Sequence, residues 1–512
     1  MQIVTPSNAT SRVGFVIPRW TVDPMHECQG VPFRAMNAAG GLFQAGCEVV
    51  WFDQEPDLDR RDRRLELREA LAGASVVFLW MQELDPLTQT ANALKLAGEI
   101  RSWYPDLRIA VGGEFITLTP ERAFELAPPF DFVLRGYGED AAPELVRAIE
   151  GRIPLVSVPG LIWREDGVQR SNPIARNTKI SAANLVLYDL LDLSGYVHDK
   201  GGIFGNGRPT LVIGTSRGCP KQCSFCYWSS HEPSMLDAED IVGLASRLFH
   251  RYGVTQFHIG ELDFATNRKR VLATARLWKE RIPDCTWFAL MSPSDAIRFT
   301  DEEWDVIAAG GCRKIEFGTE TGSARMITAI GKRHRPRDPV ELTRKLLARG
   351  IMPMHNFVFG FLGETRADRL ESLRLIRELQ RLPNAEWVFF TFRFYQAAWG
   401  TVMGEEAIQR TPDYPRTVGE MLPYRIRFGR EDVHSMQWLD AAEEREIKRM
   451  TAHYLPLTTS KLRFRSCLRQ SVYRVLRSFA RLRLRVGRFG MSWDRWLYRR
   501  LLQTRLDNTY RQ

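Results

Sequence analysis

No hydrophobic run in this chain of 512 residues approaches the roughly 20 apolar residues that span a bilayer. The first 20 residues also lack the basic segment and long apolar run that are typical of a secretory signal. Low-complexity tracts are missing, and hydrophobic residues make up 44% of the chain, which is enough to build buried cores. These absences count against a membrane-spanning or disordered protein, and we expect a folded, cytoplasmic one.

Cysteine is scarce, with eight residues in the whole chain. Five of them are isolated and are expected to be small core residues: Cys28, Cys47, Cys285, Cys312 and Cys467. The other three lie within eight positions, which favours metal ligation in a reducing compartment over a disulfide framework.

Acidic residues are scarce at the end of the chain. From Lys461 to Gln512 there are fifteen Lys and Arg residues against two Asp, so this segment carries +13 while the whole chain carries +10. On a helix, the segment RSFARLRLRVGRFG separates a basic side from an apolar one; these are Arg477, Arg481, Arg485 and Arg488 on one side, and Phe479, Leu482, Val486 and Phe489 on the other. The basic side of such a helix has three possible roles. It is exposed to solvent, it contacts an anionic membrane or, as the least favoured interpretation, it binds nucleic acid.

The length predicts several domains, because one hydrophobic core rarely organises more than about 250–300 residues. Residues 12–150 alternate short apolar runs such as VGFVIP, SVVFLW and LRIAVGG with longer amphipathic ones, which indicates a doubly wound parallel sheet, a Rossmann-like α/β domain over 1–150. Such sheets bind ligands at the carboxyl ends of their strands. Residues 151–206 are predicted to be a linker, with a hairpin that turns on Asp166 and Gly167.

Residues 207–400 repeat a β/α pattern six times. The strand candidates are PTLVIGTS, TQFHIG, TWFAL, RKIEFGTE, HNFVFGF and WVFFTFRFY. Six such units predict a partial, TIM-like (β/α)6 barrel, whose functional residues lie at the strand ends. Residues 401–512 are expected to form a mainly α-helical carboxy-terminal region that ends in the basic tail.

The three clustered cysteines follow the first strand candidate in the segment GTSRGCPKQCSFCYW, as Cys219-x3-Cys223-x2-Cys226. Three thiolates this close can hold three irons of a 4Fe–4S cluster and leave the fourth iron open to an external ligand. The alternative is zinc, which wants a fourth protein ligand such as His231. The pattern resembles that of the radical S-adenosylmethionine superfamily, and this resemblance implies an iron–sulfur cluster that cleaves S-adenosylmethionine to a 5′-deoxyadenosyl radical.

The resemblance to this superfamily extends along the barrel. It implies that Phe225 beside the third cysteine, Glu320 and Ser323 in IEFGTETGS, and Gly360 and Gly363 in FVFGFLGET contact S-adenosylmethionine. Ordinary strand-to-helix turns are the alternative for the glycines. The family's acidic element after the second strand, which would also contact S-adenosylmethionine, is present only loosely, as Glu261 in HIGELDF. Asp263 is an equally good candidate for facing the site.

The amino-terminal sheet resembles the cobalamin-binding domain of cobalamin-dependent radical S-adenosylmethionine enzymes. The resemblance rests on a GG element and a GYGE element at adjacent strand ends, and implies that cobalamin contacts Gly112, Gly113, Thr117, Gly136, Gly138 and Glu139. A nucleotide-binding sheet is the alternative, although GxGxxG after the first strand is missing. Asp23-Pro-Met-His26 departs from the spacing of a cobalt-ligating loop, so we expect His26 to be a solvated loop residue.

The two cofactors together imply methylation of an unactivated carbon in a biosynthetic intermediate, with cobalamin carrying the methyl group. Relatives in the family also include an oxidative cyclase and a ring-contracting enzyme, and both outcomes stay open. The implied partners are a small-molecule substrate, lipid-like or tetrapyrrole, and an external one-electron reductant such as flavodoxin or ferredoxin. An alternative function of a different class is an iron–sulfur or cobalamin sensor that binds a partner through its basic tail. Contact of this tail with a membrane would place the protein peripherally at that membrane.

Overall fold

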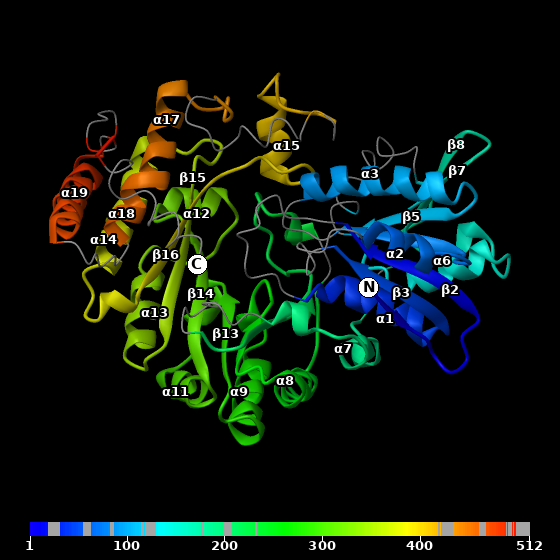
Figure 1. Cartoon of the computed structure of the whole chain (residues 1–512). Helices are drawn as coiled ribbons and strands as arrows, with labels where there is room; N and C mark the ends of the chain where they lie inside the picture. The colour runs from blue at the N-terminus through cyan, green and yellow to red at the C-terminus, as the bar shows by residue number, and fades with distance from the viewer. Residues whose placement is uncertain are drawn as a thin grey trace.

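The computed structural model describes residues 1–18, 31–54, 63–81, 86–113, 117, 130–175, 179–197, 207–230, 233–417, 420, 434–459, 467–487, 489, 494 and 496–497. Two mainly parallel sheets dominate this part of the chain, one from its first third and one from its middle (Figure 1).

The first sheet has eight strands in the order β1-β3-β2-β4-β5-β6-β7-β8. Their bounds are β1 Gln2–Val4, β2 Ser11–Ile17, β3 Cys47–Asp53, β4 Val76–Met81, β5 Arg108–Gly113, β6 Phe132–Leu134, β7 Leu161–Glu165 and β8 Val168–Ser171. Strands β2 to β6 are parallel, and β3-β2-β4-β5-β6 is the flavodoxin-like order of a doubly wound sheet. The helices are α1 Phe33–Gln44, α2 Arg63–Ala70, α3 Pro86–Trp103 and α6 Ala141–Ile149.

The hairpin expected in the linker is present, with Asp166 and Gly167 both at positive φ, but it does not stand apart. Strand β7 pairs antiparallel with β6, so the hairpin extends the first sheet by two strands. The periodicity of single strands carries no information on which neighbour they pair with. A short helix, α7 Leu187–Leu190, then leads to the second sheet.

The second sheet has six parallel strands in sequence order, β9-β12-β13-β14-β15-β16. Their bounds are β9 Thr210–Ile213, β12 Gln256–Ile259, β13 Thr286–Met291, β14 Cys312–Glu320, β15 Met352–Phe359 and β16 Phe389–Phe394. A two-stranded ribbon of β10 Ser216–Arg217 and β11 Ser234–Met235 flanks the loop that carries the clustered cysteines. The predicted doubly wound sheet and partial (β/α)6 barrel are therefore both present.

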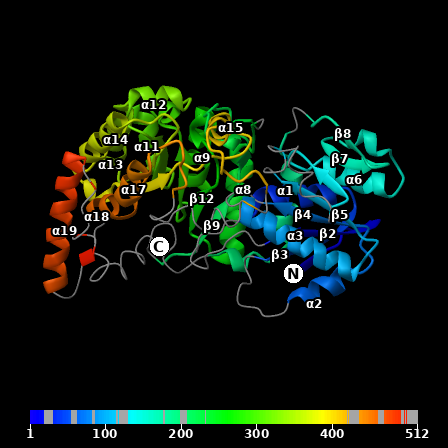
Figure 2. The ribbon, with the colours of Figure 1, turned by 90° about the horizontal axis from the view of Figure 1, so that it is seen from above.

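Helices cover the outer side of the barrel sheet (Figures 1 and 2). They are α8 Ala238–Tyr252, α9 Arg268–Arg281, α10 Pro293–Ala296, α11 Asp301–Ala309, α12 Ala324–Ala329, α13 Asp338–Leu347 and α14 Arg366–Leu379. Capping boxes begin α11, at Thr300 with Glu303, and α14, at Thr365 with Asp368. Each box satisfies amide groups that have no partner within the helix, which explains why the helices begin there.

After residue 401 the described elements are helical. They are α15 Val402–Gln409, α17 Ala441–Arg449 with a π-helical turn at Met450–Tyr454, α18 Leu455–Thr459 and α19 Cys467–Val486. The basic helix ends earlier than the sequence suggested, because Gly487 at φ +67° breaks it. Phe489 is consequently buried against Tyr454 instead of extending the apolar side of the helix, and Arg488 lies outside the described residues. No described helix is long and apolar enough to cross a membrane.

The two sheets share one hydrophobic cluster, which runs from Phe15 and Trp80 in the first sheet to Phe257 and Phe317 in the barrel. Helix α1 lies at this junction. A Cβ atom on Gly214, just after β9, would overlap the ring of Phe33 at the start of α1. Glycine is therefore required where the barrel strand meets the first domain.

Candidate active site

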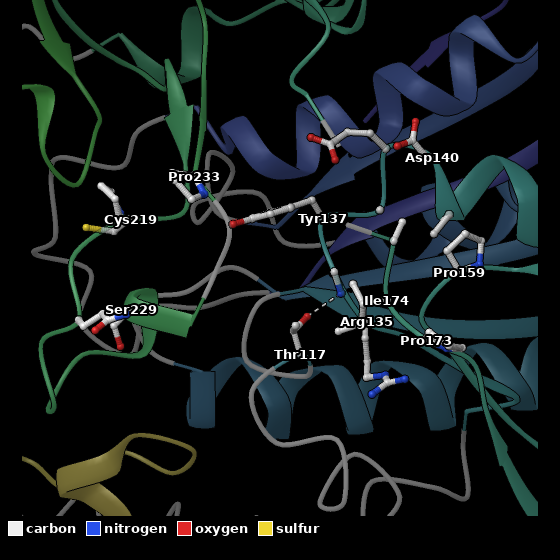
Figure 3. Close-up of a pocket in the computed structure, with 17 residues that line it drawn as sticks. Thr117, Arg135, Tyr137, Asp140, Pro159, Pro173, Ile174, Cys219, Ser229 and Pro233 are labelled. Atoms are coloured by element: carbon white, nitrogen blue, oxygen red, sulfur yellow. Dashed lines mark hydrogen bonds between the residues drawn. The ribbon is translucent and has the colours of Figure 1, made fainter. Parts of the chain in front are cut away.

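A cavity of about 700 Å³ lies where the carboxyl edge of the first sheet faces the cysteine loop (Figure 3). The loop after β6 lines one wall from Arg135 to Ala141, and Cys219, Pro220, Gln222 and Ser229 line the other. The Tyr137 ring extends from the sheet edge toward the side that carries Pro233 and Cys219. The cavity thus joins the two places at which the sequence predicted cofactors.

The three clustered cysteines are free thiols, and Cys223 is buried while Cys219 and Cys226 are partly buried. Burial raises the pKa of all three, that of Cys226 to about 12, and each thiolate would raise the others further. Such thiols ionise only when a cation compensates them, and a bound iron supplies that charge. Within the described residues, no three His, Cys, Asp or Glu side chains converge on a single-ion site. Thiolates around a four-iron cluster each bind a different iron, so the donor set fits that group.

A partly buried lysine lies beside these cysteines. Lys332 Nζ donates to Gly318 O at 2.9 Å and lies 3.1 Å from Glu320 Oε1. Burial would lower the pKa of Lys332, but the negative charges of Glu320 and Cys223 outweigh burial and raise it. Glu320, predicted to contact S-adenosylmethionine, ends β14 at φ +60°, a conformation that is strained for a glutamate.

Ser323 begins α12, where its hydroxyl accepts from Met326 N. The same hydroxyl donates to Asp368 Oδ1 at 2.6 Å, in a fully buried position. Ser323 therefore has a complete structural role as a helix cap, and its predicted contact with S-adenosylmethionine stays a prediction.

Glu261 is held by a buried ion pair. Its carboxylate accepts from Arg270 at 2.8 and 2.5 Å, and from the Thr215 hydroxyl. In a buried ion pair that is joined by two hydrogen bonds, each charge compensates the other. This geometry gives no support to the predicted cofactor contact of Glu261.

Asp263 lies closer to the cysteine loop. Its Oδ1 accepts from Ser292 N at 2.9 Å, and its Oδ2 is 3.7 Å from Lys221 Nζ within the cysteine motif. Burial and the neighbouring Asp295 raise the pKa of Asp263 to about 6. Of the two acidic residues after the second barrel strand, Asp263 is the one near the cysteines.

Phe225 packs on Phe361, with ring centroids 5.2 Å apart, next to the glycine element after β15. Gly360 is fixed on both sides, since its N donates to Glu364 at 2.6 Å and its O accepts from Trp438 at 2.9 Å. Gly360 and Gly363 both have positive φ, but a Cβ on Gly360 would meet Met436 Sδ, whereas Gly363 opens to free space.

The glycines on the other wall have a packing role. A Cβ atom on Gly112 or on Gly138 would overlap the indole of Trp80, and one on Gly113 would overlap the Met81 carbonyl. The ends of β4, β5 and β6 therefore meet at Trp80. For Gly112 and Gly138 this supplies a structural reason for glycine beside the predicted cobalamin contact.

Thr117 and Glu139 make hydrogen bonds that connect the segments of the cavity wall. The Thr117 hydroxyl donates to Gly113 O at 3.1 Å and accepts from Gly136 N at 2.7 Å (Figure 3). Glu139 pairs with the fully buried Arg217, whose guanidinium lies 4.1 Å from the Tyr137 ring centre. Burial raises the pKa of Glu139 to about 7, although Arg217 opposes that change. Glu139 thus links the sheet to the cysteine segment. His26 and His231, considered as metal ligands, lie outside the described residues.

Residues 213–376, about a third of the chain, match the family model described as the Radical SAM superfamily. These residues form a radical SAM domain. The match confirms the resemblance indicated by the cysteine motif.

Curated relatives of the chain include two enzymes with different reactions in their names. An uncharacterized methyltransferase, PH0819 of Pyrococcus horikoshii, is 28% identical over 321 residues, which is 58% of this chain and 66% of the relative. The anaerobic magnesium-protoporphyrin IX monomethyl ester cyclase of Synechocystis is 27% identical over 246 residues, 46% of each protein. The chain thus spans about half to two thirds of the length of these two relatives.

Two solved structures share the fold around the radical SAM domain. The radical S-adenosylmethionine methyltransferase TsrM from Kitasatospora setae, with cobalamin and a 4Fe-4S cluster bound, aligns with a TM-score of 0.60 at 20% identity over 78% of each chain. The cobalamin-dependent enzyme OxsB, with aqua-cobalamin and S-adenosylmethionine bound, aligns with a TM-score of 0.64 at 14% identity over 98% of this chain and 80% of that one. This fold likeness confirms the predicted order of a doubly wound sheet followed by a partial barrel.

Sequence reasoning missed three residues beside the predicted sites, Lys332, Arg217 and Trp80. Each becomes notable only through partners that are distant in the chain. Lys332 follows Gly331, but no motif in the sequence singles it out. Arg217 lies two residues before Cys219 and would have been found only by asking what neutralises Glu139.

Proposed function

We propose that this protein is a cobalamin-dependent radical S-adenosylmethionine methyltransferase that acts on an unactivated carbon of a biosynthetic intermediate. The cavity of about 700 Å³ supports this most directly, because Cys219 lines it on one side and Gly136 to Glu139 line it on the other. A radical generated at the cysteine loop and a methyl donor held at the sheet edge would then reach the same small molecule.

The proposed assignments follow the sequence. Cys219, Cys223 and Cys226 hold the cluster; Phe225, Glu320, Ser323, Gly360 and Gly363 surround S-adenosylmethionine; and the sheet edge holds cobalamin through Gly112, Gly113, Thr117, Gly136, Gly138 and Glu139. When bound, these groups supply a 5′-deoxyadenosyl radical and a transferable methyl group.

The chain's own residues position these groups and exclude water. Lys332 places a positive charge beside the cysteines, and Glu320 fixes that lysine. The buried Arg217–Glu139 pair holds the two walls together, which keeps the reacting centres at a set separation. Tyr137, with its ring against Arg217, closes the cavity on the sheet side.

The names of the relatives support the proposal. PH0819 is described as a methyltransferase, and TsrM and OxsB show that this fold accommodates cobalamin together with a cluster or S-adenosylmethionine. The likeness to the Synechocystis cyclase favours oxidative cyclisation as the second candidate reaction.

The substrate is a small molecule, for which we propose a lipid-like or tetrapyrrole character, and the electron comes from an external reductant such as flavodoxin or ferredoxin. The cyclase relative favours the tetrapyrrole. We further propose that the basic carboxy-terminal segment makes peripheral membrane contact, which would bring the enzyme to apolar substrates.

Anaerobic reconstitution with iron, sulfide and hydroxocobalamin tests the cofactors. We expect the spectroscopic signature of a four-iron cluster, about one cobalt per chain, and 5′-deoxyadenosine after chemical reduction with S-adenosylmethionine. Cys223→Ala should remove the cluster signal, whereas Cys467→Ala, on an exposed cysteine of α19, should keep it. A full cluster signal in Cys223→Ala would refute the ligand assignment.

The product separates the candidate reactions. With methyl-labelled S-adenosylmethionine, the methyltransferase adds one labelled methylene unit to its substrate, while the cyclase changes hydrogen or oxygen content without label. A sensor would form no 5′-deoxyadenosine at all. Unlabelled product would exclude the methyltransferase.

A further inference from the structure

Helix α19 is fixed on the body of the protein by one face. Tyr473, Leu476, Ala480 and Leu484 on this face are each at most 3% exposed and belong to the hydrophobic cluster that includes α14. Arg366 Nη2 also donates to Gly487 O at 2.8 Å at the end of the helix. Because the helix is held on one side, the orientation of its other faces is defined.

An apolar stripe runs along the outward face of α19. It consists of Leu468, Val475, Phe479, Leu482 and Val486, which are 74%, 52%, 39%, 54% and 53% exposed. Their spacing of seven, four, three and four residues places them on one side of a 3.6-residue helix. Helix α19 lies at the edge of the molecule in both views (Figures 1 and 2). The exposed fractions of the five side chains show that the stripe is open to solvent.

An arginine cleft lies beside this stripe. We use this name for the cavity of about 240 Å³ between α14 and α19, lined by Arg377, Gln380, Arg381, Arg481, Leu484 and Arg485. Two of its arginines come from each side, and no carboxylate of the described residues lines it. Burial and the like charges of Arg381, Arg374 and Arg485 lower the pKa of Arg377, and burial with Arg477 and Arg485 lowers that of Arg481.

These four arginines have no carboxylate among them in the part of the chain that the structure describes, and their like charges repel one another. An anion bound among them is therefore stabilised by all four. The Gln380 amide nitrogen is also buried there without a hydrogen-bond partner, which adds an unused donor. Guanidinium groups bind phosphate oxygens in pairs, and a cleft of this composition suits a phosphate group.

We propose that the arginine cleft binds the phosphate headgroups of an anionic membrane while the apolar stripe inserts between the lipid chains. This inference rests on the membrane contact proposed above and is independent of the proposed catalytic reaction. An anionic bilayer offers both phosphate and apolar surface in one plane, and each basic side chain near it contributes about 1 kcal/mol. A nucleic acid would use the arginines but would leave the apolar stripe exposed to water.

Flotation of the purified full-length protein with vesicles tests this inference. We expect binding to vesicles of phosphatidylcholine with 30% phosphatidylglycerol at physiological ionic strength, and none to pure phosphatidylcholine. Arg481→Gln with Arg485→Gln should weaken binding about 25-fold, since each arginine accounts for about fivefold. Leu482→Ser with Val486→Ser should weaken it as well, with unchanged thermal stability, because both side chains are exposed.

The matched control is Arg276→Gln with Lys279→Gln on α9, which removes the same net charge from exposed positions on the barrel. This variant should bind vesicles like the wild type. Equal weakening in the control, or no binding of the wild type to anionic vesicles, would overturn the inference. So would tighter binding to duplex DNA or RNA than to vesicles through Arg481 and Arg485, or full displacement of the vesicles by millimolar inorganic phosphate.

The same preparations separate this inference from the proposed reaction. Wild type, cleft variant and control should all form 5′-deoxyadenosine equally from S-adenosylmethionine without vesicles, because the cleft contributes no residue to the cavity between the sheets. A wild type that binds vesicles but does not cleave S-adenosylmethionine contradicts the reaction alone.

Discussion

The indole of Trp80 occupies the space that the missing side chains of Gly112 and Gly138 leave at the edge of the first sheet. This contact predicts that Gly138→Ala destabilises the cofactor-free protein by about 2–4 kcal/mol, because the new methyl group overlaps the ring and φ at this residue is +83°. Urea unfolding measures the change.

Gly363→Ala is the control for this substitution, since φ is +74° there but the Cβ would meet nothing. It should cost only about 1–2 kcal/mol, the price of the backbone conformation. Replacing Trp80 by Leu in the Gly138→Ala variant should recover part of the loss. If Gly138→Ala and Gly363→Ala were equally stable, packing against Trp80 would not be what requires glycine at position 138.

His355 makes the protein sensitive to acid. Its Nδ1 lies 2.8 Å from the Thr319 hydroxyl and its Nε2 lies 2.8 Å from the Thr343 hydroxyl, in a fully buried position. Burial lowers the pKa of His355 from its usual 6.5 to about 3. Between these values the unfolded chain binds the extra proton, so the stability that the neutral ring contributes is present above about pH 6.5 and is lost as the pH falls toward 3.

We predict that the wild type loses unfolding free energy faster than His355→Gln as the pH falls from 6.5 to 5, by up to about 1.4 kcal/mol per pH unit. Denaturant titrations at several pH values measure the difference. The comparison with the variant is necessary because Glu364, whose pKa burial raises to about 7, changes stability in the opposite direction. Parallel pH curves for the two proteins would show that His355 takes up its proton as readily in the folded protein as in the unfolded chain, which would contradict the lowered pKa.

Among the elements, α19 offers a direct comparison of its two faces. Leu484 is 3% exposed and Leu482 is 54% exposed, two residues apart on the same helix. We predict that Leu484→Ala costs about 2–4 kcal/mol of unfolding free energy and that Leu482→Ala costs less than about 0.5 kcal/mol. Similar losses in both variants, measured by thermal or chemical unfolding, would mean that the helix docks in a different rotation.

The elements themselves were largely predictable from the sequence. All six barrel strands occur where apolar runs predicted them, because buried parallel strands are continuous and strongly apolar. The motif Cys219-x3-Cys223-x2-Cys226 marked the loop that lines the cavity because its three cysteines are close together in the sequence.

What could not be predicted depends on pairings between distant residues. Nothing in the pattern around Glu261 indicates Arg270 as its partner, and nothing around Gly138 indicates Trp80. Strand β7 likewise reads as a strand, but its place beside β6 is set by tertiary packing. Periodicity reports the burial of a residue and not the identity of its neighbour.

At the scale of the whole molecule, the two sheets should unfold together, because one hydrophobic cluster crosses between them. We predict a single calorimetric transition for the cofactor-free protein. Two separate transitions would contradict this prediction.

The buried Arg217–Glu139 pair at this junction leads to a second prediction, which concerns the unfolding free energy. Arg217→Met leaves a buried carboxylate without its cation, which costs about 3–5 kcal/mol when Glu139 is ionised. The pKa of Glu139 is about 7 when folded, above its usual 4.5, so the folded state favours the protonated acid and stability falls as the pH rises through this range. The penalty for Arg217→Met should therefore be larger at pH 8 than at pH 6. A second change, Glu139→Gln, should remove that pH dependence.

The cavity has one wall from the first sheet and one from the cysteine loop of the barrel, and the shared hydrophobic cluster, the Arg217–Glu139 pair and the connecting peptide together hold these walls in place. While the chain is intact, the linker keeps the two parts at a high effective concentration relative to each other. Free fragments would reach this concentration only in a concentrated solution. Cutting this tether would turn a first-order docking step into a second-order one. Once the two parts separated, the cysteine loop would be open to solvent on the side where Glu139 and Tyr137 now lie. Dilution alone would then expose the three cysteines to oxygen.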